Sequence, residues 1–346
     1  MESKLWRITI DTNPEDCNLH CIMCEEHSEW NSFKNKLISS EGILRRRMPK
    51  EWIQKIISEA AEMGVREIIP TTMGDPLVTN SFELIASLAS AKKMKLNITH
   101  NGTFPGKSVR DWAKIIVPVT SDIKISWNGA TASIAESIMK GLNFHQAVQN
   151  LTEFIQYRDW WQSKTGYHCR VTLQLTFMRN NMHEIQAIIK LSADLGVDRI
   201  KGHHLWVHYQ ELEHLSFKRD IATIEEWNKI VQEALKAADL YRRKDGQKVL
   251  LENFNLLSVN NLNEVPDDHE CPFLGKELWI STTGQISPCC APDELRKSLG
   301  DFGNIRDMSL SDLIYSYEYQ NLINNYKSNN LCKSCNMRRP KQEQHR

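Results

Sequence analysis

Eight of the nine cysteines in this 346-residue chain fall into two groups, and they are its strongest chemical signal. Cys17, Cys21 and Cys24 form a C-x3-C-x2-C motif near the N-terminus. The second group lies in the last quarter of the chain and consists of Cys271, Cys289, Cys290, Cys332 and Cys335. In a reducing compartment, cysteines grouped in this way are typical of metal ligands or reactive thiols rather than of disulfides.

The spacing of the N-terminal motif suits an iron–sulfur cluster. Three thiolates on one tight loop can hold a four-iron cubane and leave one iron without a protein ligand. A structural zinc ion takes four protein ligands, and His20 or His27 could supply the fourth. Zinc therefore stays open on spacing alone, and three unrelated buried cysteines are the weakest of the alternatives.

The C-terminal group contains a four-thiolate signature. Cys332 and Cys335 form a C-x2-C pair that two earlier cysteines complete, and on spacing alone zinc and iron–sulfur are comparable. Cys169 stands apart from both groups. It precedes an expected strand, at the end of a barrel where chemistry is not found, and we interpret it as a buried structural thiol.

Strands and helices are expected to alternate between the two cysteine groups. The expected strands are 5–10, 66–70, 94–99, 123–127, 171–178 and 199–205. The expected helices are 51–63, 82–91, 109–116, 144–161, 185–195 and 224–241. Repeated strand–helix units with right-handed crossovers predict an α/β fold with a parallel sheet. No Gly-rich phosphate loop follows the first strand, which favours a partial (β/α)6 TIM-like barrel over a nucleotide-binding doubly wound sheet.

The chain is expected to divide into three regions. The partial barrel covers residues 1–242, a polar linker covers 243–270, and a small cysteine-rich α+β module covers 271–346. Within the module we expect a hairpin over 278–288 and a helix over 309–326. Catalytic groups of barrels lie at the C-terminal ends of the strands, and the polar motifs of this sequence fall there.

The cysteine loop after the first strand of a partial barrel resembles that of the radical S-adenosylmethionine (radical SAM) superfamily. The resemblance implies that Cys17, Cys21 and Cys24 hold a [4Fe–4S] cluster whose open iron binds SAM. Reductive cleavage of SAM then gives a 5′-deoxyadenosyl radical that abstracts a hydrogen atom from the substrate. Many members have an aromatic residue before the third cysteine, where this chain has Met23, which could pack against adenine.

The resemblance extends to motifs at the later strand ends. Thr72-Met-Gly-Asp-Pro76 stands where the family has Gly-Gly-Glu-Pro, so Gly74 and Asp75 are expected to accept hydrogen bonds from the SAM ammonium. The other implied SAM contacts are Asn101 in Thr99-His-Asn-Gly-Thr103, Ser126 in Ile125-Ser-Trp-Asn-Gly129, Lys140 in Lys140-Gly141, and Gln174 in the fifth strand. The Asp for Glu, His100 and Trp127 depart from the family pattern.

The order of features in the C-terminal module resembles the SPASM/twitch extension of radical SAM enzymes, which binds auxiliary [4Fe–4S] clusters. Five cysteines are fewer than the full SPASM form carries, so the shorter form with one auxiliary cluster is implied. The pattern assigns Cys271, Cys289, Cys332 and Cys335 as the ligands, and Cys290 could exchange with Cys289.

Three residues are candidates for catalysis. Cys290 could donate a hydrogen atom, as in radical epimerases. His203 and His204 end the sixth strand, where an imidazole could act as acid, base or hydrogen-bond donor. Because adjacent strand residues point to opposite sides, at most one of the two faces the pocket. Glu25 and Glu26 follow the cysteine loop, either at the pocket mouth or solvated.

The resemblance implies an oxidoreductase that dehydrogenates a small sugar or aminocyclitol-like intermediate, with an electron donor of the flavodoxin or ferredoxin type. Only 16 residues precede Cys17, which favours a small molecule over a peptide that needs a leader-binding domain. The alternatives are a redox-neutral epimerase, an enzyme that modifies ribosomally made peptides, and, more remotely, a zinc-stabilised binding protein without catalysis.

Net charge and hydropathy exclude several classes of binding partner. The chain has 43 Lys+Arg and 43 Asp+Glu, so no excess positive field favours nucleic acid or an anionic membrane. Its apolar stretches are far shorter than the ~20 residues that span a bilayer, and the N-terminus lacks the apolar segment of a signal peptide. We therefore expect a cytoplasmic protein.

Overall fold

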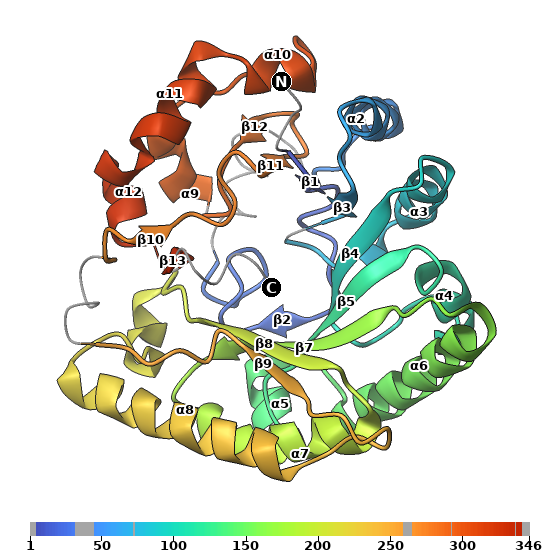
Figure 1. The fold of residues 1–346 in the computed structure, drawn as a ribbon, viewed down its shortest axis with the longest axis vertical. Coiled ribbons are helices and arrows are strands. Elements are labelled where there is room, and N and C mark those ends of the chain that lie inside the picture. The colour runs from blue at the N-terminus through green and yellow to red at the C-terminus, as the bar shows by residue number, and fades with distance from the viewer. Residues whose placement is uncertain are drawn as a thin grey trace.

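The computed structural model of the protein describes residues 5–31, 45–71, 73–258, 265–291, 293–335 and 337–340. Thr72, which opens one of the motifs quoted above, lies outside these ranges. The described chain is organised around one curved sheet, with the strand order β12-β11-β1-β3-β4-β5-β7-β8-β9 (Figure 1). Every neighbouring pair is parallel except β11 with β12.

Six strands and the helices outside them form the partial (β/α)6 barrel predicted from the sequence. The six strands are β1 (Arg7–Ile10), β3 (Glu67–Ile69), β4 (Lys95–His100), β5 (Thr120–Ser126), β7 (Arg170–Phe177) and β8 (Arg199–His204). The helices are α2 (Lys50–Glu62), α3 (Phe82–Ala91), α4 (Val109–Ile116), α5 (Ala132–Ile138), α6 (Phe144–Thr165), α7 (Ile185–Leu195) and α8 (Ile221–Leu240). They cover the outer face of the sheet (Figure 1).

Alternation along the strands separates an apolar outer face from a polar inner face. In β5, Ile123 and Ile125 are fully buried, whereas Asp122 and Lys124 line the space inside the barrel. Burying one isoleucine side chain contributes about 1.5–3 kcal/mol, so the outer face holds the helices on the sheet. The polar inner face is left for ligands.

Helix boundaries follow from local capping. The Asn143 side chain accepts a hydrogen bond from Gln146 N at the start of α6, and Gly166 ends that helix with a φ of 74°. Asp220 and Thr223 form a capping box at the start of α8. This cap is the reason that α8 begins before the residue indicated by apolar periodicity.

The C-terminal part of the chain differs from the expectations in three ways. The segment 243–270, expected as a linker, contributes β9 (Leu250–Glu252), which pairs with β8. The expected hairpin forms β11 (Glu277–Ile280) and β12 (Ile286–Ser287), but β11 extends the barrel sheet beside β1. The single helix expected over 309–326 is broken, because Ser316 caps a new helix start.

The two helices that result are α10 (Leu310–Ile314) and α11 (Tyr317–Asn325), and α12 (Asn330–Lys333) lies with them beside the open edge of the barrel (Figure 1). Hydrogen bonds tie this module to α2. Lys55 Nζ donates to the Ile305 carbonyl (2.6 Å), and Leu310 N donates to Glu59 Oε2 (2.9 Å). The remaining short elements are β2 (His20–Cys21), β6 (Met139–Lys140), β10 (His269–Glu270), β13 (Arg339–Pro340) and α9 (Asp293–Arg296).

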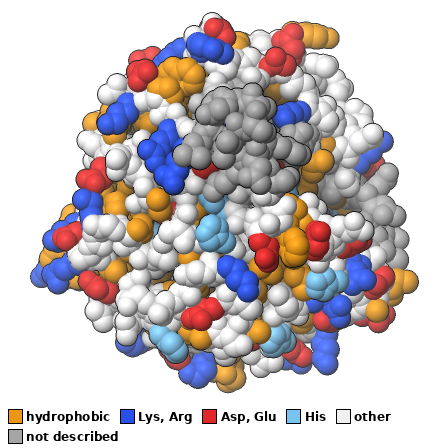
Figure 2. Space-filling view, turned by 180° about the vertical axis from the view of Figure 1, so that it is seen from behind, with side chains coloured by type: hydrophobic (Ala, Val, Ile, Leu, Met, Phe, Trp, Pro, Cys, Tyr) orange, Lys and Arg blue, Asp and Glu red, His pale blue; other side chains and the backbone are white. Residues whose placement is uncertain are grey.

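The surface mixes both signs of charge. On the face shown in Figure 2, basic and acidic side chains are interspersed with polar and apolar ones. This distribution accords with the equal numbers of acidic and basic residues in the sequence. Within the described residues, no helix combines the length and the apolar character needed to cross a membrane.

Candidate functional site

The N-terminal cysteine loop leaves the C-terminal end of β1 and is held by a second strand pairing. β2 pairs antiparallel with β6, so that His20 lies opposite Lys140. Ile22 N donates to the Ile138 carbonyl (2.9 Å), and Met23 packs against the hydrophobic core. Lys140 therefore lies beside the cysteine loop, but its side chain is exposed, so a solvated lysine and a contact with SAM both stay open.

Gly74 brings the loop after β3 into direct contact with the segment before Cys17. A Cβ atom on residue 74 would lie 2.0 Å from the Asn13 carbonyl oxygen and 2.7 Å from that of Asp16. Asp75 N donates to the Asp16 carbonyl (2.8 Å), and Asn13 Nδ2 donates to the Asp75 carbonyl (3.0 Å). Because only glycine permits this approach, Gly74 sets the position of the cysteine loop.

The Asp75 carboxylate has partners within the protein. Its oxygens accept hydrogen bonds from Asn101 N (2.9 Å) and Leu77 N (3.0 Å), and one lies 2.8 Å from Nδ1 of His100. Phe104 N donates to Nε2 of His100 (3.2 Å), so the ring proton sits on Nδ1 and is donated to Asp75. This geometry supports a role for Asp75 in positioning the loop after β4. Its direct contact with SAM stays a prediction.

Asn101 connects the end of β4 with the first cysteine. Its amide nitrogen donates to Asn18 Oδ1 (2.8 Å) and lies 3.8 Å from the Cys17 sulfur. Its amide oxygen accepts hydrogen bonds from Thr103 N (3.0 Å) and Oγ1 (2.7 Å). The structure thus places Asn101 next to the cysteine loop, as its motif indicated, whereas a contact with SAM itself stays a prediction.

The three N-terminal thiols lie in an environment that fits a [4Fe–4S] cluster. Burial is the main cause that raises the pKa of each thiol above its ordinary value, for Cys24 to about 11. Thiolates are the ligating form, and a bound metal removes the thiol proton that burial would otherwise retain. Among the described residues, no three His, Cys, Asp or Glu side chains are arranged to hold a metal ion by themselves.

The four C-terminal cysteines expected as ligands lie together. Three of them accept a hydrogen bond from a backbone N–H two or three residues later, each with an N···S distance of 3.4 Å: Leu274 to Cys271, Ala291 to Cys289, and Met337 to Cys335. Burial, followed by the charges of the other three thiols, raises the pKa of Cys332 to about 12. N–H groups that donate to sulfur are a common means of tuning iron–sulfur clusters, so this set fits one auxiliary cluster.

The surroundings of Cys289 and Cys290 differ. Cys289 accepts the Ala291 N–H, whereas Cys290 lines the cavity inside the barrel. A hydrogen bond from the Cys290 thiol lowers the pKa of Cys289, and the same contact raises the pKa of Cys290. We infer that Cys289 is the cluster ligand and that Cys290 is a protonated thiol that faces the interior.

Replacing each of these cysteines separately tests the inference. We expect Cys289→Ala to lose the auxiliary cluster, and with it about four irons per chain, because a ligand is missing. Cys290→Ala should keep the iron content of the wild-type protein. Iron and sulfide counts on anaerobically purified protein measure both results, and equal loss of iron in the two variants would contradict the inference.

A cavity of about 500 Å³ lies inside the barrel, and His203 faces it. His204 points the opposite way and packs on Trp227, with ring centroids 4.7 Å apart, as expected for adjacent strand residues. Burial lowers the pKa of His203 to about 4. Gln174 Nε2 donates to His203 Nδ1 (3.2 Å), so the ring proton sits on Nε2. His203 is therefore a neutral hydrogen-bond donor toward the cavity.

Ser126 and Gln174, both expected near SAM, are paired in register on β5 and β7. Gln174 lines the interior cavity, and Ser126 is the last residue of its strand. Ser126 thus lies at the strand end where barrels carry out chemistry, and Gln174 lies beside it in the middle of β7. Their contacts with SAM stay predictions.

The charged inner face of the barrel was not anticipated from the sequence. The charged residues that line the cavity are Arg7, Glu67, Asp122, Lys124, Arg170, Arg199, Lys201 and Glu277. The signal for most of them was a polar residue at every second position of the expected strands. Such a pattern indicates a strand with one polar face, which here lies inside the barrel.

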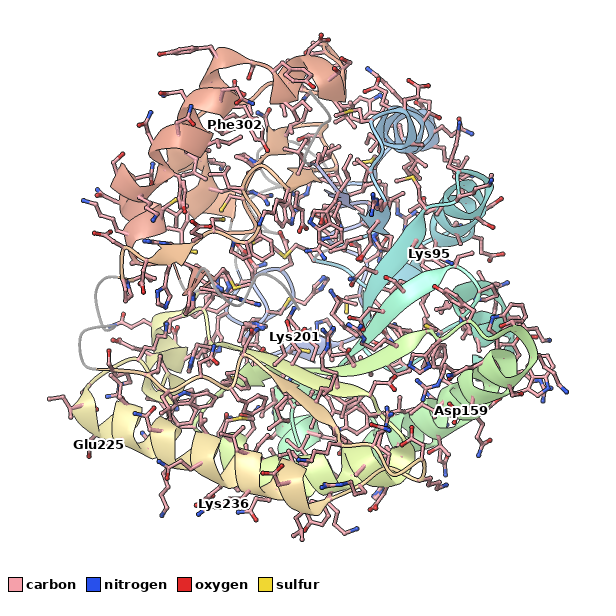
Figure 3. All side chains as sticks on the ribbon, viewed as in Figure 1. Lys95, Asp159, Lys201, Glu225, Lys236 and Phe302 are labelled. Carbon is pink, nitrogen blue, oxygen red and sulfur yellow. The ribbon has the colours of Figure 1, made fainter. Side chains whose placement is uncertain are left out.

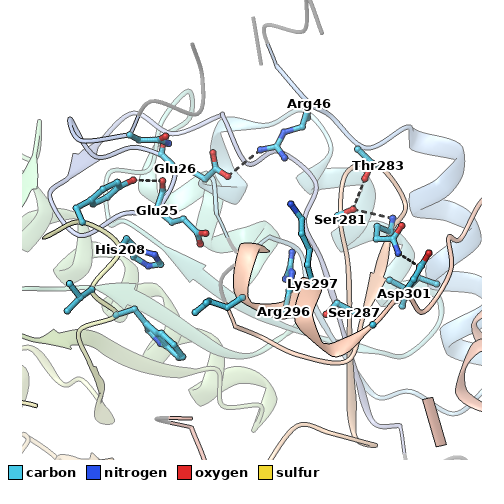
Figure 4. A pocket seen from close by; sticks show the side chains of 18 residues that line it. Glu25, Glu26, Arg46, His208, Ser281, Thr283, Ser287, Arg296, Lys297 and Asp301 are labelled. Atoms are coloured by element: carbon cyan, nitrogen blue, oxygen red, sulfur yellow. Dashed lines mark hydrogen bonds and ion pairs between the residues drawn. The ribbon is translucent and has the colours of Figure 1, made fainter. Parts of the chain in front are cut away.

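A larger groove of about 1020 Å³ lies at the rim of the barrel (Figure 4). We call it the rim groove; its walls come from the cysteine loop, the segment after β8 and the C-terminal module. Of the two places expected for Glu25 and Glu26, the structure favours a pocket, because both line this groove. Burial raises the pKa of Glu26 to about 7, although Arg46, 3.3 Å away, opposes this.

Residues 271–336 match the SPASM family model, which is described as an iron–sulfur cluster-binding domain. This range includes all four cysteines that we assign to the auxiliary cluster. Across the whole chain, PqqA peptide cyclase from Bradyrhizobium diazoefficiens is 21% identical over 334 residues, which cover 93% of this chain and 76% of the relative.

The fold is shared with solved structures, among them the following two. SuiB from Streptococcus suis bound to S-adenosylmethionine has a TM-score of 0.66 at 16% identity, over 93% of this chain and 68% of SuiB. Native anSMEcpe with bound AdoMet has a TM-score of 0.63 at 15% identity, over 92% of this chain and 83% of that protein. The barrel with its C-terminal module is thus an architecture that occurs in SAM-binding proteins.

Proposed function

We propose that this protein, which is a radical SAM enzyme with a C-terminal SPASM module, abstracts a hydrogen atom from a carbon of its substrate and oxidises the product radical through the auxiliary cluster. One observation carries the proposal. The interior cavity is lined by the inner faces of the barrel strands and also by Cys290, which adjoins the four-cysteine group. A substrate in this cavity would therefore lie beside the auxiliary cluster, which could take an electron from the substrate radical.

The chain's own residues position the reactants. When bound at the N-terminal loop, the cluster supplies the electron that cleaves SAM to the hydrogen-abstracting 5′-deoxyadenosyl radical. Gly74 and Asn101 fix that loop, and His203 offers an N–H to a substrate oxygen. Four protein thiolates leave no iron open in the auxiliary cluster, which favours electron transfer. A flavodoxin or ferredoxin-type protein would be the external electron donor.

A peptide segment is the substrate class that the rim groove supports best. The groove is about 1020 Å³ in volume, opens to solvent and leads over the cysteine loop. Ser281 and Thr283 (Figure 4), together with Gln285, give it a polar wall suited to an extended backbone. Relatives act on or bind peptides: one is named PqqA peptide cyclase, and SuiB has been solved with its precursor peptide SuiA.

A compact sugar or aminocyclitol is the second candidate, and it is the substrate expected from the sequence. The interior cavity of about 500 Å³ favours it, because the lining is rich in hydrogen-bonding groups suited to a polyol. Dehydrogenation of a carbinol would use the same residues as oxidation of a peptide carbon.

Deuterium transfer separates these two substrate classes. The cluster-loaded enzyme is incubated with SAM, dithionite and either a pool of deuterated peptides or a pool of deuterated sugars and aminocyclitols. The hydrogen removed from the substrate ends in 5′-deoxyadenosine, so we expect deuterated 5′-deoxyadenosine with the peptides. Deuterium transfer from the sugar pool alone would replace the peptide proposal by the second candidate.

Epimerisation is the alternative reaction that the position of Cys290 favours, because a thiol in the cavity could return a hydrogen atom. An oxidised product lacks a pair of hydrogens, whereas an epimer formed in D2O gains one deuterium. The mass of the product therefore decides between the reactions. Loss of product in Cys290→Ala, with SAM cleavage retained, would support the epimerase.

A further inference from the structure

Lys124 is a cation on the inner face of the barrel for which the described residues supply no hydrogen bond or ion pair. It lies on β5, two residues before the end of the strand, and lines the interior cavity. Within the parts of the chain that the structure describes, its ammonium group forms neither a hydrogen bond nor an ion pair. Lys124 is half-buried, and a cation that faces a cavity without a partner is a candidate to bind an anionic group of a ligand.

The acidic side chains around Lys124 are already engaged. The inner-face ion pairs are Arg7 with Glu277, Arg199 with Asp122, and Lys201 with Glu252. Glu67 accepts a hydrogen bond from Asn97 Nδ2 (2.8 Å). Figure 3 shows Lys201 on the inner side of the sheet, whereas Glu225 and Lys236 lie on the outer helix. Among the described residues that line the cavity, Lys124 is thus a cation without an ion pair, whereas Arg7, Arg170, Arg199 and Lys201 each form one.

Thr99 lies beside Lys124, and the described residues supply no hydrogen-bond partner for its side chain either. The parallel register places Thr99 of β4 directly opposite Lys124, and both side chains line the cavity. Within the described residues, the Thr99 hydroxyl has no hydrogen-bond partner. A hydroxyl next to an ammonium group offers two donors to one acceptor group.

We propose that Lys124 and Thr99 form a subsite that binds a carboxylate group of the substrate. The proposal rests on the proposed function in so far as the cavity receives the substrate. One surplus cation and one hydroxyl match a singly charged carboxylate. Glu67 and Asp122 lie close enough to act on the Lys124 charge and repel any anion, and this repulsion is about twice as large for a phosphate dianion as for a carboxylate.

The position of Lys124 below the strand end suits a group that anchors the substrate. Lys124 lies two residues below the end of β5, which is about 7 Å along the strand. The SAM contacts are expected at the strand ends, so a carboxylate bound by Lys124 leaves the rest of the substrate nearer to SAM. The subsite therefore anchors the substrate below its reacting carbon.

Calorimetric titration of the cluster-loaded, SAM-bound enzyme tests the subsite. The probes are acetyl-Gly-Glu-Gly-amide, the same peptide with Gln in place of Glu, and free succinate. We expect the Glu peptide to bind at least about tenfold more tightly than the Gln peptide, because a hydrogen bond to a charged group is lost in the latter. Tighter binding of succinate than of the Glu peptide would support the subsite with a small carboxylate as its source.

Four variants test whether carboxylate binding depends on Lys124 and Thr99. Lys124→Met should weaken binding of the Glu peptide and of succinate about tenfold or more, and Lys124→Arg should largely restore it. Thr99→Val, which keeps the shape of the side chain, should weaken binding of the Glu peptide and of succinate several-fold. Lys190→Met removes an exposed lysine paired with Asp194 on α7 and should leave binding of both carboxylate probes unchanged.

The pH dependence gives a second readout. Burial, followed by the charge of Lys201, lowers the pKa of Lys124 to about 8. The other charged groups that face it are Arg7 of β1, Glu67 of β3 and Asp122 of β5 itself. The ammonium is charged below this pKa, so succinate affinity should be highest below about pH 8 and fall as the pH rises through that value.

Several results would overturn the subsite: equal binding of the Glu and Gln peptides, unchanged succinate binding by Lys124→Met, or succinate affinity independent of pH between about 7 and 9. A loss of SAM affinity in Lys124→Met would also overturn it, because Lys124 would then hold SAM. The titrations require no turnover. Failure of wild-type enzyme to form 5′-deoxyadenosine would therefore count against the proposed function alone.

Discussion

Replacing Cys17 with alanine is expected to abolish both the N-terminal cluster and the formation of 5′-deoxyadenosine. A cubane that leaves one iron open has three protein ligands. Replacing one cysteine leaves only two thiolates to hold the cluster. Iron should fall by about four per chain, and SAM cleavage should fall to the level of a reaction without protein. Iron and sulfide counts, followed by chromatography of the SAM products under dithionite, measure both results.

Cys169→Ala is the matched control. Cys169 is as fully buried as any residue of the core, yet it lies just before β7, at the opposite end of the barrel from the cysteine loop. Its replacement should reduce the free energy of unfolding by about 1–2 kcal/mol and leave the iron content unchanged. If Cys17→Ala still cleaved SAM, the assignment of the N-terminal cluster would be wrong.

The grouping of the cysteines was predictable because its signals are local. Cys332 and Cys335 share one turn of chain, and Cys271 and Cys289 flank the hairpin formed by β11 and β12. A hairpin is encoded by its own residues, and it returns the chain to its starting point. The spacing indicated four thiols at one site, and the resemblance to the SPASM/twitch pattern, rather than local geometry, chose Cys289 over Cys290 as the fourth ligand.

The outward and inward directions of strand residues were predictable for the same reason. His203 and His204 had to diverge, because consecutive strand residues point to opposite faces. Which of them faced the cavity required the register with β7, which the sequence does not contain. The charge of Lys124 was visible in the sequence, but its lack of a partner among the described residues depends on groups from three other strands, β1, β3 and β8.

Pairing between distant segments could not be predicted. β11 lies beside β1, and Arg7 Nε donates to Glu277 Oε2 (2.7 Å) across 270 residues of sequence. The hydrogen-bond partners of Asp75 could not be predicted from the sequence either. A carboxylate after a strand has the same sequence signature whether it faces a ligand or accepts hydrogen bonds from His100 and Asn101. Tertiary contacts decide between these roles.

Gly74→Ala is expected to reduce SAM cleavage about 100-fold or more without removing any ligand, because a displacement near 1 Å in a catalytic geometry has effects of this size. The added Cβ would lie 2.0 Å from the Asn13 carbonyl oxygen. Backbone atoms cannot rotate away as a side chain can, so the segment before Cys17 must shift. We expect weaker cluster retention, measured as iron per chain, together with the loss of 5′-deoxyadenosine.

Gly64→Ala separates this displacement from general destabilisation. Gly64 has a φ of 78°, and an added Cβ there would meet nothing within 4 Å. Alanine at this position should cost about 1–2 kcal/mol of stability through its left-handed backbone, while iron content and SAM cleavage stay at wild-type levels. If both glycine variants lost activity in proportion to their stability, Gly74 would be a residue of the fold alone. Loss confined to Gly74→Ala would mean that the loop after β3 positions the cluster by backbone contact, a role that no side chain at residue 74 could fill.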